Sequence, residues 1–492
     1  MERMGRAMLP ALKVAHGRMP TRTRVVQFGE GGFLRAFVDA MIDAANEKAD
    51  MDAGVAVVQP IPHGLVEELR AQDGLYTLIL RGRAGGRDVS DARVITCVRA
   101  CVDPYADFDA FLALARDPDV RFVVSNTTEA GIVYTGKDAL DDRPQASFPG
   151  KLTRLLYERF TAFGGARDKG LILLPVELID DNGARLKACV VQTAAQWGLG
   201  EAFTRWLDEA CVFTSTLVDR IVTGYPRQEA QALCADLGYE DRLLDAAEPF
   251  GQWVIEGPAW LEDELPLRRA GQDVRFTQDV RPYKLRKVRM LNGAHTATAL
   301  IGYLAGLDTV GECMADAAAR RYVERALYEE IMPTLDLPRD ELEAFAAAIL
   351  ERFQNPYNRH ELLSIALNSQ SKLRARVLPT IRAYWARRAA LPRVLTFSVG
   401  AFLAFYCGAD GAAPGLRADG TAYAPVDDAD VLAFFEELRG LSPQETARAA
   451  LSNAALWGED LTAWPGLADA AAQALSDIRT LGARRALDAI AG

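Results

Sequence analysis

Cysteine and histidine are scarce in this chain, which has seven cysteines and four histidines among its 492 residues. Cysteines this sparse and irregular do not form a disulfide framework, and they are consistent with a reducing cytosol. No two of them have the CxxC spacing of a zinc-binding pair, so we expect no metal site. This composition indicates a cytoplasmic protein without structural disulfides or zinc.

Positive charge and long apolar runs are also lacking. The 56 lysine and arginine residues are outnumbered by 67 aspartate and glutamate residues, which gives a net charge of −11 and leaves no domain-wide basic surface for nucleic acid. The most apolar segment, residues 394–409, is shorter than the roughly 18 residues of a membrane-spanning helix, and the N-terminus has no signal-peptide core. We expect neither a nucleic acid nor a membrane partner, and a buried core helix at residues 394–409.

The first part of the chain alternates short apolar runs with amphipathic stretches. Helical patterns at residues 33–48 and 105–116 separate runs rich in β-branched residues, and this order is typical of βαβ units in a doubly wound parallel sheet. Around the turn-rich segment RGRAGGRD, residues 75–82 and 94–103 resemble the arms of a hairpin-like insertion. The predicted parallel strands are residues 24–29, 55–60, 121–126 and 171–178.

After about residue 280 the strand runs disappear and Ala/Leu/Arg/Glu-rich helical patterns follow. Leu342, Phe345, Ile349 and Phe353 form one apolar stripe, and Ser442 begins a later helix with a capping box. The length allows two to four domains. We therefore predict an α/β dinucleotide-binding domain at residues 1–280 and an all-helical domain at residues 281–492 that binds substrate.

A glycine motif, Gly29-Glu30-Gly31-Gly32, follows the first predicted strand and opens the first helix. A dinucleotide pyrophosphate needs such a tight turn, close backbone approach and a free helix N-terminus. Leu34 replaces the third fingerprint glycine, so an ordinary glycine-rich turn remains the alternative. The second strand ends at Gln59, with neither the acid that favours NAD nor a basic residue for NADP, which leaves the choice of cofactor open from the residues alone.

A second motif combines Lys287, Asn292 and His295 within a predicted helix. At 100° per residue these three side chains fall within about 140° of one face, whereas Lys284 lies roughly 16 Å from His295. Five basic residues between 281 and 289 form a local positive island, which suits a lysine general base with a lowered pKa. The alternative is a solvated basic helix end with a buried amide.

Two strand-end loops and one later segment supply further candidates, because loops after the carboxyl ends of parallel strands line the ligand crevice. Asn182 belongs to an Asn-Gly pair after the fourth strand, Asn126 and Thr127 follow the third, and Asp219 lies in residues 215–220. An Asn-Gly turn needs no function, and the same caution applies to the other loops.

Together these segments resemble the mannitol dehydrogenase family of polyol-specific long-chain dehydrogenases, over about residues 24–405. The resemblance implies a Rossmann-type domain, a helical domain, an active site between them and no metal. It makes Lys287 the general acid/base, Asn182 and Asn292 the oxyanion pocket, and His295 and Asp219 the partners of substrate hydroxyls. The matching blocks are VVQFGEGGFLRAFVD, VVQPIPHG, QDGLYTLILRG, RFVVSNTTEAGI, LLPVELIDDNG, KLRKVRMLNGAHT and NPYNRHELLSIALNSQSK.

The family resemblance also indicates cofactor and substrate. Relatives commonly carry aspartate where this chain has Gln59, and Phe-His-Arg where it has Phe33-Leu34-Arg35. The second departure favours members that reduce D-tagaturonate to D-altronate in hexuronate breakdown. With Gln59 in place of the aspartate, NAD as the cofactor is implied only by the resemblance to those members. The alternatives are fructuronate, mannitol or another polyol, or a nucleotide sensor without catalysis. The implied cofactor-binding residues are Phe28, Gly29, Gly31, Gly32, Phe33, Gln59, Asn126, Thr127 and Glu129.

A sugar-acid substrate needs a cation for its carboxylate. His360, Lys372 and Arg376 lie in the matching block of the helical domain, although each is equally consistent with a plain surface charge. The sequence leaves the oligomeric state and the physiological direction of the reaction open.

Overall fold

The computed structural model describes residues 2–128, 130–408, 415–417 and 419–492. The chain divides into two compact units, Met1–Val280 and Arg281–Gly492. Along the described residues, no helix combines the length and the apolar character that crossing a membrane requires.

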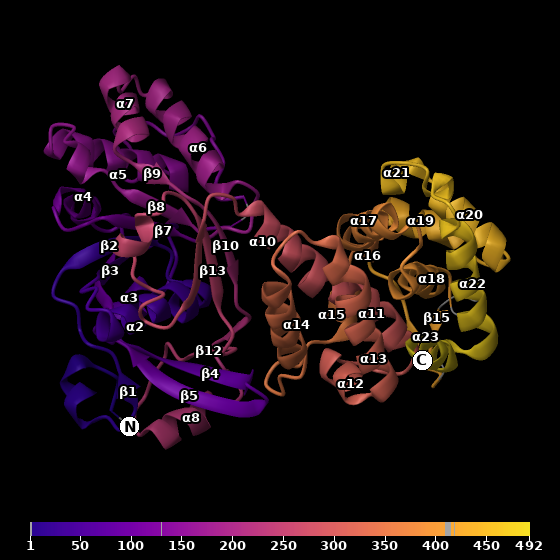
Figure 1. Cartoon of the computed structure of the whole chain (residues 1–492). Coiled ribbons are helices and arrows are strands. Elements are labelled where there is room, and N and C mark those ends of the chain that lie inside the picture. The colour runs from indigo at the N-terminus through magenta and orange to yellow at the C-terminus, as the bar shows by residue number, and fades with distance from the viewer. Residues whose placement is uncertain (1, 129, 409–414, 418) are drawn as a thin grey trace. The chain divides into compact units, whose positions relative to one another are not determined.

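The first unit is built on a six-stranded, fully parallel sheet (Figure 1). Its strands are short and largely buried on both faces, which explains why they are continuous runs of Val, Ile, Leu and Phe. All four predicted strands are confirmed. In spatial order the strands are β6 (Val98–Val102), β3 (Gly54–Val58), β2 (Thr23–Phe28), β7 (Phe122–Ser125), β8 (Ile172–Pro175) and β9 (Val212–Phe213).

Helices cover both faces of this sheet, so the doubly wound prediction is confirmed. Val25 packs in one core cluster with Phe37 and Met41, whereas its neighbour Val26 packs in another with Leu152, as the alternation of side chains along a strand requires. Residues of a continuous helical stretch pack against the sheet in the first cluster. This stretch consists of α1 (Gly32–Leu34), a π turn (Arg35–Asp39) and α2 (Ala40–Lys48). In the second cluster the other face of the sheet packs against α4 (Phe108–Arg116), α5 (Phe148–Ala162) and α6 (Asn182–Gln196).

The hairpin prediction was partly wrong. The hairpin is formed by β4 (Tyr76–Ala84) and β5 (Arg87–Ile95), joined at Gly85-Gly86, where both φ angles are positive. Residues 98–102 are instead β6 of the parallel sheet. One apolar run, residues 94–102, therefore ends one strand and begins another, and its hydrophobicity alone does not separate the two.

The hairpin belongs to a second sheet, and a third sheet lies elsewhere in this unit. The second sheet has the order β1 (Ala15–His16), β5, β4, β12 (Asp245–Ala247) and β11 (Val222–Gly224). The third consists of β10 (Ser215–Asp219), β13 (Gln252–Glu256) and β14 (Asp273–Thr277).

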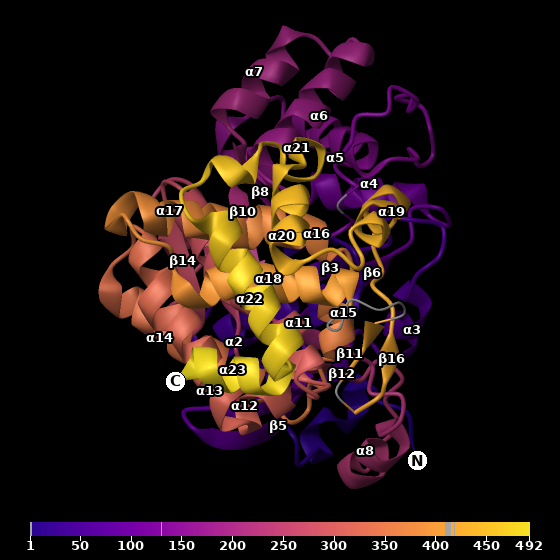
Figure 2. The same ribbon diagram turned by 90° about the vertical axis from the view of Figure 1, so that its right-hand side faces the viewer.

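The second unit is helical, as predicted, apart from the two-residue strands β15 (Gly415–Leu416) and β16 (Ala422–Tyr423). Its core helix α18 (Arg393–Cys407) is almost entirely buried, so this prediction is confirmed; it packs against α11 (Gly293–Leu304) and α22 (Leu467–Leu481) (Figure 2). The predicted apolar stripe is buried on α14 (Arg339–Phe353). The predicted capping box begins α20 (Pro443–Ser452), where Ser442 and Glu445 satisfy each other's backbone N–H.

Candidate active site

The glycine turn joins β2 to the helical stretch that starts at Gly32. Gly29 has a φ of 124°, and a Cβ there would lie 2.9 Å from Leu34 Cδ1 and 3.3 Å from the carbonyl oxygen of Asn126. Only glycine fits this position. Leu34, which replaces the third fingerprint glycine, packs beneath the turn. A Cβ on Gly31 would meet no atom within 4 Å, so the backbone is open to a ligand there.

Two buried charged residues, Arg35 and Asp245, contact the glycine turn. The Arg35 guanidinium donates to the carbonyl oxygens of Glu30 (3.2 Å) and Leu243 (2.6 Å) and lies 3.5 Å from Asp245 Oδ2. A Cβ on Gly32 would lie 3.1 Å from the same Asp245 oxygen. Burial raises the pKa of Asp245 to about 6, although Arg35 opposes the shift. Asp245 is far away in the sequence and belongs to no motif, so sequence reasoning missed it.

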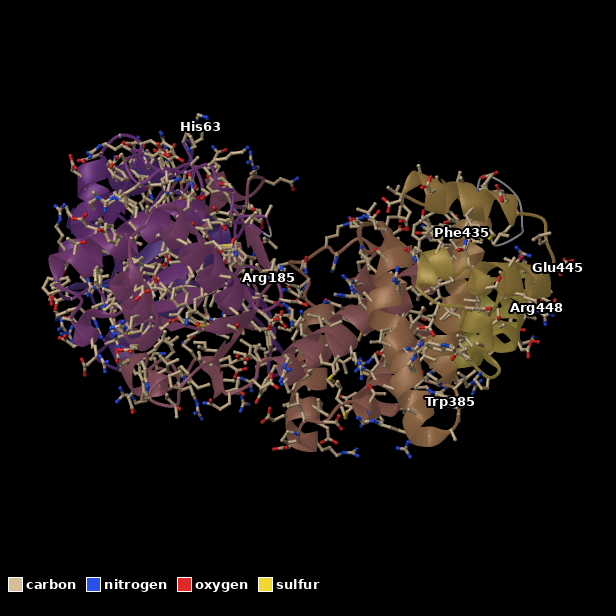
Figure 3. All side chains as sticks on the ribbon, turned by 90° about the horizontal axis from the view of Figure 1, so that it is seen from above. His63, Arg185, Trp385, Phe435, Glu445 and Arg448 are labelled. Atoms are coloured by element: carbon tan, nitrogen blue, oxygen red, sulfur yellow. The ribbon has the colours of Figure 1, made fainter. Side chains whose placement is uncertain are left out.

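The end of β3 lies beside the turn, since the Gly29 N–H donates to the Val58 carbonyl at 3.0 Å. Gln59 is buried there, and Glu30 reaches over from the glycine turn to accept a hydrogen bond from the Leu65 N–H (3.3 Å). His63 is exposed in the loop that follows β3, at the surface of this unit (Figure 3).

The loop after β7 is held by a buried carboxylate that sequence reasoning also missed. Glu177 accepts hydrogen bonds from the Thr127 N–H (3.0 Å), the Thr127 hydroxyl (3.1 Å) and the Ser125 hydroxyl (3.1 Å). The Asn126 N–H donates to the Phe28 carbonyl (3.2 Å). Asn126 and Thr127 therefore lie next to the glycine turn; Glu129 is outside the described residues.

Asn182 begins α6 rather than forming an Asn-Gly turn; the residue in the left-handed region is Asp181, with a φ of 52°. The Asn182 side chain is fully buried. Its amide donates to the carbonyls of Pro175 (3.0 Å), Glu177 (3.0 Å) and Thr216 (3.1 Å), and its oxygen accepts the N–H of Gly183 and Thr216 (both 2.9 Å). These contacts join the end of β8 to β10, so Asn182 holds the two strands in position. Its predicted role as an oxyanion donor stays a prediction.

Asp219 is the last residue of β10 and is buried, opposite Gln252 of β13. The next residue, Arg220, donates to the Ala36 carbonyl (2.6 Å) and the Phe250 carbonyl (2.8 Å). Arg220 thereby ties the end of β10 to the helical stretch that follows the glycine turn.

In the second unit, Lys287 and Asn292 bound a π-helical turn, Lys287–Asn292, between α10 (Arg281–Arg286) and α11. The predicted uniform α-helix is therefore wrong here. In a π turn the backbone hydrogen bond runs from residue i to i+5, so Asn292 lies one turn beyond Lys287, on its side of the helix. Single π turns of this kind occur frequently at functional sites.

Two of the basic residues around Lys287 contact other segments of this unit. Arg286 is buried, with its guanidinium 4.1 Å from the ring centroid of Phe345. Arg289 donates to the Thr334 carbonyl at 2.9 Å. At least two of the five predicted island members are thus bound into the helical packing.

His295 lies on α11 between two rings. Its imidazole stacks on Phe353 with centroids 4.2 Å apart and meets His360 edge-on at 4.9 Å. Burial, His360, Arg352 and Arg376 hold the pKa of His295 well below its usual value. Burial and Lys372 lower the pKa of His360. Both imidazoles are therefore neutral near pH 7 and have one donor and one acceptor nitrogen each.

Two further cations lie close to these rings. Lys372 Nζ donates to the Ile365 carbonyl at 2.9 Å, and burial followed by Arg376 lowers its pKa. Arg376 donates to the Thr296 hydroxyl (3.3 Å), which in turn donates to the Asn292 carbonyl (2.8 Å). Lys372 and Arg376, which are distant from Asn292 and His295 in the sequence, thus lie near these two residues in the fold.

Sequence profiles of two known domains match nearly the whole chain. The mannitol dehydrogenase Rossmann domain matches residues 23–269, and the mannitol dehydrogenase C-terminal domain matches residues 279–479. The chain belongs to the mannitol dehydrogenase family. This membership makes it an oxidoreductase of CH–OH groups with a nicotinamide cofactor.

Within the mannitol dehydrogenase family, curated relatives of similar length are about half identical to the chain. Altronate oxidoreductase of Klebsiella pneumoniae (strain 342) is 51% identical over 94% of this chain and 96% of its own length. Altronate oxidoreductase of Escherichia coli O7:K1 is 50% identical with the same coverage.

Two solved structures share the fold of this chain. D-sorbitol dehydrogenase in a substrate-free form has a TM-score of 0.82 at 23% identity and covers 98% of this chain and 100% of that one. Mannitol 2-dehydrogenase of Pseudomonas fluorescens, in a ternary complex with NAD and D-mannitol, has a TM-score of 0.69 at 21% identity, with 99% of both chains covered.

Proposed function

We propose that the protein is an altronate oxidoreductase, which interconverts D-tagaturonate and D-altronate with NAD(H). The observation that carries the proposal is the 50–51% identity to altronate oxidoreductases over 94% of the chain. The cations near His295 provide physical support, because the substrate is a carboxylate. The seven free cysteines are consistent with action in the reducing cytoplasm.

The first unit has the features that a dinucleotide needs. The open space above Gly31 and the left-handed Gly29 form a cradle that a side chain would fill. Residues that would hold the cofactor lie at the ends of adjacent parallel strands: Phe28, Gly29, Gly31, Gly32, Phe33, Gln59, Asn126 and Thr127; Glu129 remains part of the proposed set. When bound, the nicotinamide supplies the hydride for the keto carbon or accepts it from the alcohol.

Lys287 is the general acid/base in this proposal. In the reducing direction its ammonium donates to the substrate oxygen as the carbonyl becomes an alcohol, and in the oxidising direction its amine takes that proton back. In this proposal Asn292, one π turn further, donates a hydrogen bond to the same oxygen and stabilises its developing negative charge. Asn182 supports the site by holding β8 to β10 through its side-chain amide, and its part in an oxyanion pocket stays a prediction.

His295 and Asp219 orient the substrate hydroxyls in this proposal. His295 keeps a fixed ring plane because it stacks on Phe353, and a neutral imidazole both donates and accepts a hydrogen bond. Asp219, in the first unit, is proposed to accept a hydrogen bond from a substrate hydroxyl.

Lys372 and Arg376, with His360 beside them, are proposed to bind the carboxylate. Each cation lies partly buried, so its attraction for an anion is less screened by water than at the surface. A neutral polyol needs no such pair, which favours a sugar acid over mannitol as the substrate.

The test measures oxidation of D-altronate and of D-mannitol with NAD⁺, for the wild type and for Arg376→Met. We expect turnover of altronate, and a KM for altronate at least tenfold higher in the variant. Mannitol as the better substrate of the wild type, with an unchanged KM in the variant, would overturn the proposal in favour of a polyol dehydrogenase.

A further inference from the structure

The acid that usually selects NAD is missing from the end of the second strand of the parallel sheet. In dinucleotide-binding folds an Asp or Glu at this place accepts a hydrogen bond from the adenosine 2′-hydroxyl. Here β3 is followed by Gln59, a neutral amide. An enzyme of this fold that selects NAD without that acid needs another acceptor near the same strand end.

Glu30, in the middle of the glycine turn, places its carboxylate there. A Cβ on Gly64 would lie 1.8 Å from Glu30 Oε1 and 2.7 Å from Gln59 Oε1, so both side chains converge on one backbone position of the loop after β3. Glu30 thus comes from β2 and the glycine turn, yet its carboxylate lies at the end of β3.

One oxygen of this carboxylate is uncommitted. Glu30 is only 7% exposed. Oε1 accepts a hydrogen bond from the Leu65 N–H, whereas Oε2 is buried and has no hydrogen-bond partner among the described residues. A buried carboxylate oxygen without a donor is energetically costly, and a ligand hydroxyl would satisfy it.

The surrounding charge disfavours a phosphate. Asp103, which follows β6 beside β3, adds negative charge and, after burial, raises the pKa of Glu30. Arg35 opposes this shift, but its guanidinium donates to the backbone carbonyls of Glu30 and Leu243 and lies beside Asp245. The field at Glu30 Oε2 therefore suits a neutral hydroxyl donor.

We infer that Glu30 replaces the second-strand acid: its Oε2 accepts the hydrogen bond of the adenosine 2′-hydroxyl and excludes the 2′-phosphate of NADP. This inference rests on the proposed function, because it requires that the glycine turn bind a dinucleotide. It assigns coenzyme selectivity to the glycine turn, which in most fingerprints only approaches the pyrophosphate.

The test measures dissociation constants by NADH fluorescence, without any sugar substrate, for NADH, NADPH and an NADH analogue that lacks the adenosine 2′-hydroxyl. We expect the wild type to bind the deoxy analogue and NADPH at least tenfold more weakly than NADH, since a site built to bind a hydroxyl rejects the analogue without it. In Glu30→Ala, NADH and the deoxy analogue should bind alike, and the discrimination against NADPH should fall at least tenfold.

The matched control is Glu67→Gln, which removes a carboxylate of α3 (Val66–Ala71) whose side chain is 74% exposed and paired with Arg70; it should leave all three constants unchanged. Equal binding of NADH and the deoxy analogue by the wild type overturns the inference even if Glu30→Ala does not fold. So does a Glu30→Ala variant that discriminates like the wild type. A wild type that binds no coenzyme overturns the proposed function as well.

Discussion

The imidazole of His295 lies almost flat on the ring of Phe353, with an angle of 14° between the planes. This contact joins α11, which follows the π turn of Lys287 and Asn292, to the last turn of α14. Stacking fixes the ring plane and burial keeps the imidazole neutral, so His295 presents a donor and an acceptor in defined directions.

Phe353→Leu should therefore weaken substrate binding more than it weakens the fold. We expect a loss of about 1 kcal/mol of stability and a KM for the sugar acid roughly tenfold higher, because the imidazole loses its fixed plane. Phe345→Leu, on the same stripe of α14 but against Arg286, is the control with a similar stability loss. Steady-state kinetics and thermal unfolding separate the two effects, and an equal rise in KM for both variants would refute this role of the stack.

Lys287→Met should abolish most turnover without affecting the coenzyme. General acid–base catalysis contributes about 10²–10⁴-fold, so we expect kcat to fall by this factor while the Kd of NADH stays the same. Lys284→Met, three residues earlier in α10, should change kcat by less than about threefold. Single-turnover NADH oxidation checks both variants; a near-normal rate in Lys287→Met would remove the assignment.

Alanine substitutions in the glycine turn should have opposite effects at two neighbouring positions. Gly31→Ala meets no atom and needs no unusual φ, so the protein should unfold at the wild-type temperature but bind NADH at least tenfold more weakly. Gly29→Ala forces alanine to a φ of 124° against Leu34, which costs about 1–3 kcal/mol of strain before any effect on binding. Calorimetric unfolding and NADH titration distinguish the two; tight NADH binding by Gly31→Ala would mean that the open space serves no ligand.

Asp39, buried beneath the parallel sheet, should make stability depend on pH. It accepts hydrogen bonds from the Tyr76 hydroxyl (3.0 Å) and Gln27 Nε2 (3.5 Å), but burial outweighs them and raises its pKa from 3.8 to about 7. Because the folded pKa lies above the unfolded value, its contribution is fully present below pH 4 and is lost as the pH rises through 7. The shift corresponds to a contribution on the order of 4 kcal/mol.

Asp39→Asn cannot ionise, so its urea midpoint should decline less than that of the wild type between pH 4 and pH 8. Asp50→Asn, at an exposed residue paired with Arg18, should follow the wild-type curve. Parallel pH curves for Asp39→Asn and the wild type would show that Asp39 ionises normally.

The sequence predicted secondary structure correctly where the local hydrophobic pattern matches the burial of the residues in the fold. The strands around Val25, Val55 and Val123 were predicted because each is short, β-branched and buried on both faces. The role of Gly29 was also predictable, since a turn between strand and helix at that spacing needs a positive φ.

Contacts between distant segments were not predictable. Asn182 has five backbone partners, two of them on Thr216, and no periodicity connects these residues. Glu30 meets the end of β3, and Asp245 lies beside the glycine turn, only because the fold brings β3 and β12 to that turn. The π turn after Lys287 is likewise invisible to a pattern of 100° per residue, and it changes which residue lies beside the lysine.

The most direct test of the proposed activity is the ratio of kcat/KM values for NADH-dependent reduction of D-tagaturonate, D-fructuronate and D-fructose. We expect kcat/KM for tagaturonate to exceed that for fructose by at least about 100-fold, because Lys372 and Arg376 bind the carboxylate, and also to exceed that for fructuronate. Equal or higher values for fructose would contradict the sugar-acid assignment, and a preference for fructuronate would contradict the choice of tagaturonate.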